Sequence, residues 1–262
     1  MSTATAPVRT GHAPIPMMRL VGVEIRKMFD TRSGFWLMVS TGILSVLAAL
    51  AVVAFGGDGS QTYESYGTAI GVPMAILLPV MAILSVTSEW SQRTGLTSFT
   101  LVPHRGKVIG AKALATLVVG VAAMVIAMAV GALGTLIGAA VHGVDPEWNI
   151  SAIQVLGIIV ANVVGMFMGF MLGLLIRNSP GAIVGYFVYS FVIPTILGML
   201  YALQEWYRDI SGWVDFQMNS TMLFAMDQMS GKDWAQLGVT SVIWLFAPIA
   251  LGLYFTLRSE VK

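Results

Sequence analysis

Residues 113–141 read ALATLVVGVAAMVIAMAVGALGTLIGAAV and contain no charged side chain. At a rise of 1.5 Å per residue, about 20 residues of α-helix cross a hydrocarbon core of about 30 Å. This run is therefore long enough to span a bilayer, and we expect it to tilt or to extend out of the membrane at one end. It predicts a transmembrane helix.

Five further apolar stretches lie on either side of this run. They cover residues 34–55, 68–88, 152–176, 181–203 and 236–257. Across the chain, 56% of residues are hydrophobic and 10% are charged, whereas roughly a quarter are charged in soluble globular proteins. We therefore predict an all-α, polytopic membrane protein in which residues 34–262 form a domain of six transmembrane helices.

Two segments precede the first apolar stretch. Residues 1–16 are small, polar and proline-containing, which predicts a disordered N-terminal tail. Residues 17–33 place apolar and basic side chains on opposite sides of a helix, which predicts an amphipathic elbow helix in the cytoplasmic membrane interface. An ordinary solvated helix is the alternative. The apolar side comprises Met17, Val21, Ile25, Met28 and Phe29, and the polar side comprises Arg19, Arg26, Lys27 and Asp30.

Lysine and arginine residues are concentrated in alternate connections between the spans. Only Arg208 and Lys232, of fourteen in the chain, lie outside the N-terminal segment, the connections after spans two and four, and the C-terminus. Because these residues are retained on the cytoplasmic side during insertion, both termini are predicted to be cytoplasmic. We expect a multi-pass protein of the plasma membrane, in a bacterium.

The chain lacks the motifs of several common catalytic sites. It contains no phosphate-binding loop, no His-Glu-x-x-His zinc helix and no Gly-x-Ser-x-Gly nucleophile turn. It has no cysteine, its three histidines are widely separated, and no basic run marks a nucleic-acid site. No Asp, Glu, Lys or Arg lies inside an apolar stretch, where a proton-coupled carrier needs a titratable group. We therefore expect no enzymatic activity, no cofactor, no metal and no nucleic-acid partner, and any transport would need an external source of energy.

Glycines at four-residue spacing mark two of the predicted spans. They are Gly134 and Gly138 in one span, and Gly165, Gly169 and Gly173 in the other. Small residues at this spacing allow close approach of helix backbones in lipid. We predict that these glycines form helix-packing surfaces rather than ligand sites, and a contact with a second subunit is compatible with the same surfaces.

The connection at residues 88–112, SEWSQRTGLTSFTLVPHRGKVIGAK, is the longest predicted cytoplasmic connection between spans. Its basic residues are expected to form a rim where the chain returns to the membrane. A soluble partner could dock on this connection, and a plain positive-inside loop is the alternative. The rim comprises His104, Arg105, Lys107 and Lys112.

This connection resembles that of the type-2 ABC transporter permeases, which share the membrane fold of the ABCG-like, or type V, exporters. The resemblance is carried by Glu89, Thr94, Gly95, residues 101–105 and Lys112. It extends to the segments VEIRKMFDTRSGFW before the first span and IRNSPGAIVGYFVY between the fourth and fifth spans. The chain departs from the family where Pro103 is followed by a histidine in place of the first of two basic residues.

The resemblance implies a cytoplasmic coupling helix that rests on a separate ATPase subunit, which would bind ATP and Mg²⁺. The residues implied are Glu89, Gln92, Arg93, Thr94 and Gly95. A second permease subunit, identical or different, would complete the transporter in the membrane lipid. The outer loop at residues 204–235 would dip into the membrane, and an ordinary outer loop is the alternative.

The implied function is outward movement of an amphipathic or lipid-like substrate at the expense of ATP hydrolysed by the partner. Apolar spans without buried charge suit such a cargo better than a small ion. The competing hypothesis is a membrane anchor or assembly factor for a cytoplasmic complex, with no transport role.

Overall fold

A computed structural model describes residues 15–91 and 105–258. Within these two ranges the chain forms helices and no strand, apart from an isolated β-bridge between Thr62 and Glu147. Six segments are long and apolar enough to cross a membrane. They are Arg32–Phe55 (α2), Tyr63–Ser88 within α3 (Tyr63–Ser91), Gly106–His142 within α5 (Arg105–His142), Ala152–Ile176 (α6), Ser179–Leu203 and Gly231–Arg258.

The prediction of an all-helical chain with six membrane-length helices is confirmed, because each predicted stretch falls within one of these segments. The bounds of α6 coincide with the predicted stretch, whereas α3 and α5 extend beyond theirs. With 38 residues, α5 is about 57 Å long, far more than the hydrocarbon core requires.

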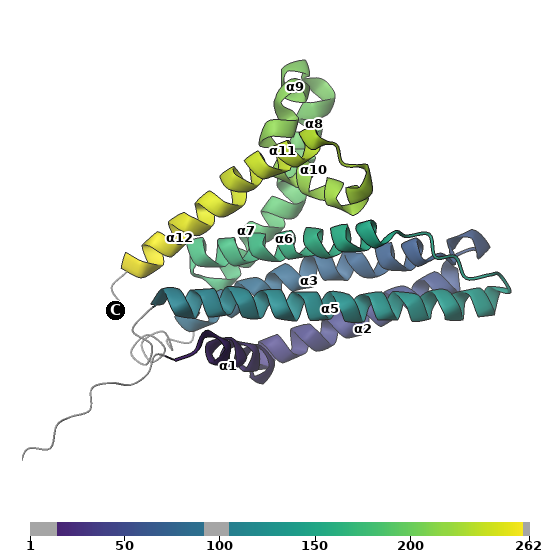
Figure 1. Ribbon diagram of the computed structural model, residues 1–262, viewed down its shortest axis with the longest axis horizontal. Coiled ribbons are helices and arrows are strands. Elements are labelled where there is room, and N and C mark those ends of the chain that lie inside the picture. The colour runs from purple at the N-terminus through teal and green to yellow at the C-terminus, as the bar shows by residue number, and fades with distance from the viewer. Residues whose placement is uncertain (1–14, 92–104, 259–262) are drawn as a thin grey trace, which may run out of the picture.

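Four helices, α2, α3, α5 and α6, run side by side as a bundle (Figure 1). The central helix is α3, on which Tyr66, Leu78, Ile83 and Val86 are fully buried. By contrast, α2 leaves Leu47 and Leu50 half exposed. A helix that is apolar all round but buried on one side only is suited to lipid on its other side.

The first helix, α1 (Met17–Asp30), packs against α5 and α2 at the end of the bundle where α12 (Ala247–Arg258) also ends (Figure 1). It ends earlier than predicted, because Thr31 adopts an extended conformation and its side chain accepts a hydrogen bond from Gly34 N to cap α2. The predicted 17–33 helix is therefore divided between α1 and α2. Most of the predicted disordered tail, residues 1–14, lies outside the described residues.

The fifth spanning segment packs against the bundle at its start and diverges from it toward its end. It consists of α7 (Ser179–Phe187), a π-helical turn η2 (Val188–Val192) and α8 (Ile193–Leu203). Ala182 and Tyr186 of α7 are buried against the bundle, whereas α8 contains no buried residue and projects away from it (Figure 1). The sixth segment, α11 (Gly231–Ser241), η4 (Val242–Phe246) and α12, returns to the bundle, where Gly252 lies against Leu174.

The predicted outer loop at residues 204–235 contains a series of short helices. They are α9 (Glu205–Val214), α10 (Phe216–Thr221) and η3 (Met222–Gln228), followed by the first turn of α11. Local caps explain the breaks: Asp215 accepts a hydrogen bond from Met218 N to start α10, and Ser230 and Asp233 form a capping box that starts α11. The segment is anchored by Phe216 and Leu223, which are buried in a cluster with Met168 of α6.

Candidate functional site

The predicted coupling residues lie mainly in the segment between α3 and α5. Gln92, Arg93, Thr94, Gly95 and His104 are outside the described residues. Glu89 belongs to the last turn of α3 and Arg105 is the first residue of α5, and the structure describes only the backbone of these two. The predicted 88–112 connection is therefore shorter than expected, because both of its ends continue the flanking helices.

The two lysines of the predicted basic rim have different environments. Lys107 is exposed in the first turn of α5. Lys112 is instead buried, and its Nζ lies 2.6 Å from Glu24 Oε2 of α1 and 3.0 Å from the backbone oxygen of Ser85 in α3. Lys112 is thus part of the helix bundle rather than of an exposed rim.

The Glu24–Lys112 ion pair joins α1 to the two helices that flank residues 92–104. The side chains of Glu24 and Lys112 are 9% and 4% exposed, so each needs a charged or hydrogen-bonding partner. Lys27 contributes a further contact, with its Nζ 2.7 Å from Glu24 Oε1. Sequence reasoning missed Glu24, although its position between Val21 and Met28 places an acid on the buried face of the helix.

The three glycines of α6 face α3 within the same chain. A Cβ atom added to Gly169 would lie 2.5 Å from the backbone oxygen of Pro79, and one added to Gly173 would lie 3.3 Å from that of Ile83. Gly165 has more room, with Pro79 Cγ at 3.9 Å. The α6 glycines therefore lie at a close backbone contact between helices.

The two glycines of α5 also face α3, but they lie against a side chain. Gly134 and Gly138 leave space for the ring and hydroxyl of Tyr66, which is fully buried and hydrogen-bonded to Gln61 Oε1. Gln61 in turn donates to backbone oxygens at the end of α2, including that of Gly56 at 3.3 Å. These glycines accommodate an aromatic side chain rather than the backbone of another helix.

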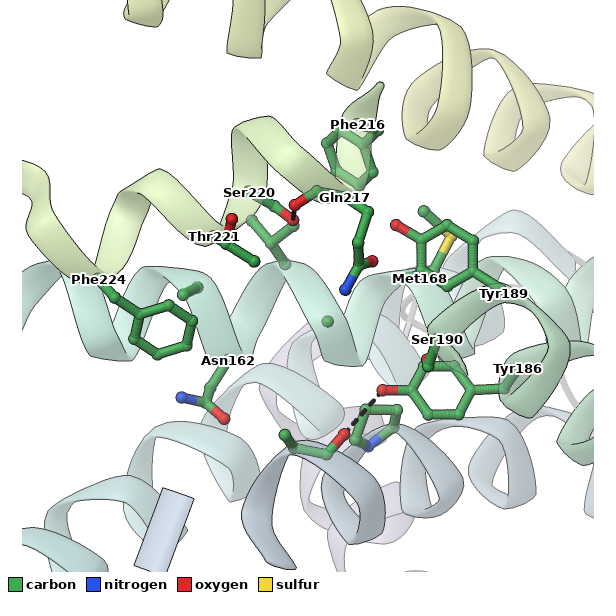
Figure 2. A pocket seen from close by; sticks show the side chains of 15 residues that line it. Asn162, Met168, Tyr186, Tyr189, Ser190, Phe216, Gln217, Ser220, Thr221 and Phe224 are labelled. Atoms are coloured by element: carbon green, nitrogen blue, oxygen red, sulfur yellow. Dashed lines mark hydrogen bonds between the residues drawn. The ribbon is translucent and has the colours of Figure 1, made fainter. Parts of the chain in front are cut away.

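A proline inside α3 leaves one backbone carbonyl of this helix without its usual hydrogen-bond donor. Pro79 has no N–H to donate to the carbonyl of Ala75 one turn earlier. The Tyr186 hydroxyl of α7 donates to that oxygen at 2.7 Å, shown by the dashed line in Figure 2. Tyr186 therefore satisfies the backbone group that the proline leaves open and links the fifth spanning segment to α3.

A small cavity of about 110 Å³ lies beside this hydrogen bond (Figure 2). Its walls come from α3, α6, the fifth spanning segment and the α10–η3 segment. Many of the lining residues are polar. The polar lining residues are Asn162, Tyr186, Tyr189, Ser190, Gln217, Ser220 and Thr221. Such a cavity can hold water or a polar group of a ligand.

A larger cavity of about 420 Å³ adjoins the small one and shares Ala75, Asn162 and Phe224 with it. It lies between the first halves of α3 and α6 and the middle of α5. Its volume falls in the range of small-molecule sites, about 300–1,000 Å³. Sequence reasoning missed both cavities, because the lining residues come from distant parts of the chain and carry no shared motif.

The helices indicate a multi-pass helical membrane protein, and two cavities lie among them. Within the described ranges, no group of three or more His, Cys, Asp and Glu residues could hold a metal ion. Comparison with known protein families found no matching family, and comparison with curated proteins found no match either.

Proposed function

We propose that the chain is the membrane subunit of an ABC exporter with a type V membrane fold. It would pair with a second permease subunit and with separate ATPase subunits that bind ATP and Mg²⁺. The observation that supports this most is the meeting of α1, the end of α3 and the start of α5 around the Glu24–Lys112 ion pair. In the resembling family, the connection between these two spans receives the ATPase.

The contacts suggest how a movement of the ATPase would reach the membrane. A push on residues 89–95 moves the end of α3, which is tied to α5 and α1 through Ser85, Lys112 and Glu24. The same helix forms one wall of both cavities and holds Tyr186 through the Ala75 carbonyl. Displacement of α3 therefore changes the shape of the cavities, which is the step that a transporter requires. The substrate is amphipathic or lipid-like.

The α10–η3 segment is proposed to re-enter the membrane from the outer side. Phe216 belongs to the same buried cluster as Met168, which lies about 24 Å along α6 from its first residue. Leu223 packs on the same helix near its start, where its backbone oxygen leaves no space for a Cβ atom at Gly157. Contacts so far along a spanning helix support a position of this segment partly within the bilayer.

Both termini are proposed to face the cytoplasm of a bacterial cell. Because the chain has no cysteine, single cysteines report position without background. We expect Gly57→Cys and Gly231→Cys to react with an impermeant maleimide added to intact cells, and Gly106→Cys and Ser179→Cys to react only after lysis. Gly143 is unsuitable, because its φ of +67° favours glycine. Labelling in the reverse pattern would contradict the orientation and the location of the docking connection.

The ATPase partnership is tested by Glu89→Gln, which keeps the shape of the side chain and removes its charge. If the carboxylate accepts a charge-assisted hydrogen bond from the ATPase, its loss should weaken coupling by about 1.5–3 kcal/mol, or roughly 10- to 150-fold. We would measure copurification of a nucleotide-binding subunit, its ATPase rate and transport of an amphiphile in vesicles. Membrane insertion should be unchanged.

The matched control is Asp209→Asn, an exposed acid on α9. It should leave copurification and transport at wild-type levels. Normal transport in Glu89→Gln would exclude the coupling role. If no ATPase copurifies with the wild-type chain, the function as a permease is wrong and the membrane-anchor hypothesis gains support.

A further inference from the structure

The larger cavity has the volume and lining of a site for one apolar chain. Its middle is formed by aliphatic and methionine side chains and by glycines that leave space. These residues are Ile70, Gly71, Val72, Met74, Met124, Ala127, Met128, Gly131 and Ile158. Glu64 and Val72 of the lining are both exposed, so the cavity opens to its surroundings at these residues and a ligand can enter it.

The polar groups of this cavity are gathered toward one end, where α3 and α6 begin. Glu64 is held there by Asn149, whose Oδ1 accepts from Glu64 N at 3.1 Å and whose Nδ2 donates to Glu64 Oε2 at 3.2 Å. Tyr63 is fixed nearby by a hydrogen bond to Met128 O and by its ring contact with Trp148. A carboxylate is thus positioned at the mouth of an apolar chamber.

The charge around this mouth is negative. Asp145 and Glu147 lie on the same connection as Asn149, and no lysine or arginine lines the cavity among the described residues. An anionic headgroup would be repelled there. An ammonium group would be attracted, and the Glu64 carboxylate would be its counter-ion. The carboxylate therefore favours a ligand with a positive charge, and the apolar walls favour a ligand with an apolar chain.

We propose that this cavity binds a single-chain amphiphile with one cationic group, which lies at Glu64 while the apolar chain lies between α3, α5 and α6. The small polar cavity beyond Asn162 and Phe224 accommodates a polar group at the far end of longer ligands. The site lies within one subunit. It is a property of this chain alone and does not depend on the ATPase partnership.

The test uses the full chain in phosphatidylcholine nanodiscs, with dodecyltrimethylammonium as the cationic probe and dodecanol as the neutral one. In Gly71→Leu the added side chain should fill the cavity, because a Cβ atom at Gly71 meets nothing within 4 Å and the new side chain has room to enter. We expect both probes to bind at least about tenfold more weakly to this variant. The matched control is Gly42→Leu, at an exposed glycine of α2 with equally open surroundings, and it should bind both probes as the wild type does.

Glu64→Gln distinguishes the contribution of the ligand's headgroup to binding from that of its tail. Because Glu64 is exposed, loss of its charge should weaken the binding of dodecyltrimethylammonium by up to about fivefold. The binding of dodecanol should be unchanged. An equal effect on both probes, or none on either, would overturn the assignment of the cation. Unaltered binding to a folded Gly71→Leu variant would overturn the site itself.

Photocrosslinking of the wild type provides a measurement that does not depend on the folding of a variant. A dodecyltrimethylammonium analogue with a diazirine in its chain should label peptides from the first half of α3 and the middle of α5. Labelling confined to other helices would overturn the proposal. Because every readout is binding without ATPase, failure of the site and failure of the exporter function are distinguishable.

Discussion

Lys112→Met should destabilise the packing of α1 against the bundle by about 3 kcal/mol. Removing one partner of a buried ion pair typically costs about 3–5 kcal/mol, because the other charge stays buried without compensation. Here the lower end applies, since Lys27 Nζ remains 2.7 Å from Glu24 Oε1. The loss of the hydrogen bond to the Ser85 carbonyl acts in the same direction. Thermal unfolding in detergent and proteolysis at α1 would both report the effect.

Two further variants identify the ion pair as the cause. Lys107→Met removes an exposed lysine from the same helix and should change stability by less than about 0.5 kcal/mol. Glu24→Gln combined with Lys112→Met should be less destabilising than Lys112→Met alone, because no charge is then left buried. A Lys107 variant as unstable as the Lys112 variant, or additive effects in the double variant, would contradict the role of the pair.

Gly169→Leu should separate α3 from α6 and lower stability by about 3 kcal/mol or more. Overpacking usually costs about 1–3 kcal/mol when neighbouring side chains can move. At Gly169 the nearest obstacle is the backbone oxygen of Pro79, 2.5 Å from an added Cβ, and a helix backbone cannot rotate away. The Tyr186–Ala75 hydrogen bond, one turn from Pro79, should weaken with it. Thermal unfolding and recovery of copurifying subunits are the measurements.

Gly165→Ala and Gly169→Ala form the matched comparison, since both introduce one methyl group on the same helix. At Gly165 the nearest atom is Pro79 Cγ at 3.9 Å, an ordinary contact. Gly165→Ala should therefore be neutral or gain up to about 1 kcal/mol from helix propensity, whereas Gly169→Ala should lose stability. Equal stability of the two variants would show that α3 and α6 do not approach as closely as the structure has them.

The candidate site was only partly accessible to sequence reasoning. The resemblance selects Glu89, Gln92, Arg93, Thr94 and Gly95 for coupling, and four of these five positions lie among residues that the structure does not describe. Lys112 was recognised as a basic residue near the membrane, but its burial against Glu24 was not, because the two residues are 88 positions apart. The cavities were missed for the same reason: no local pattern relates Glu64 to Asn149 or Pro79 to Tyr186.

The sequence by itself determined the number and type of the spanning elements. Every backbone group within lipid needs a partner, and a helix supplies partners locally, so about 20 consecutive apolar residues are enough to specify a spanning helix. The tertiary structure alone decided which faces meet. It placed Gly134 and Gly138 around the Tyr66 side chain of α3 but Gly169 and Gly173 against the α3 backbone, although the spacing of the two sets is the same. It also folded residues 205–228 into short helices, of which α10 and η3 contact α6, and it opened the cavities. Packing depends on side-chain shape across distant segments, and composition does not encode it.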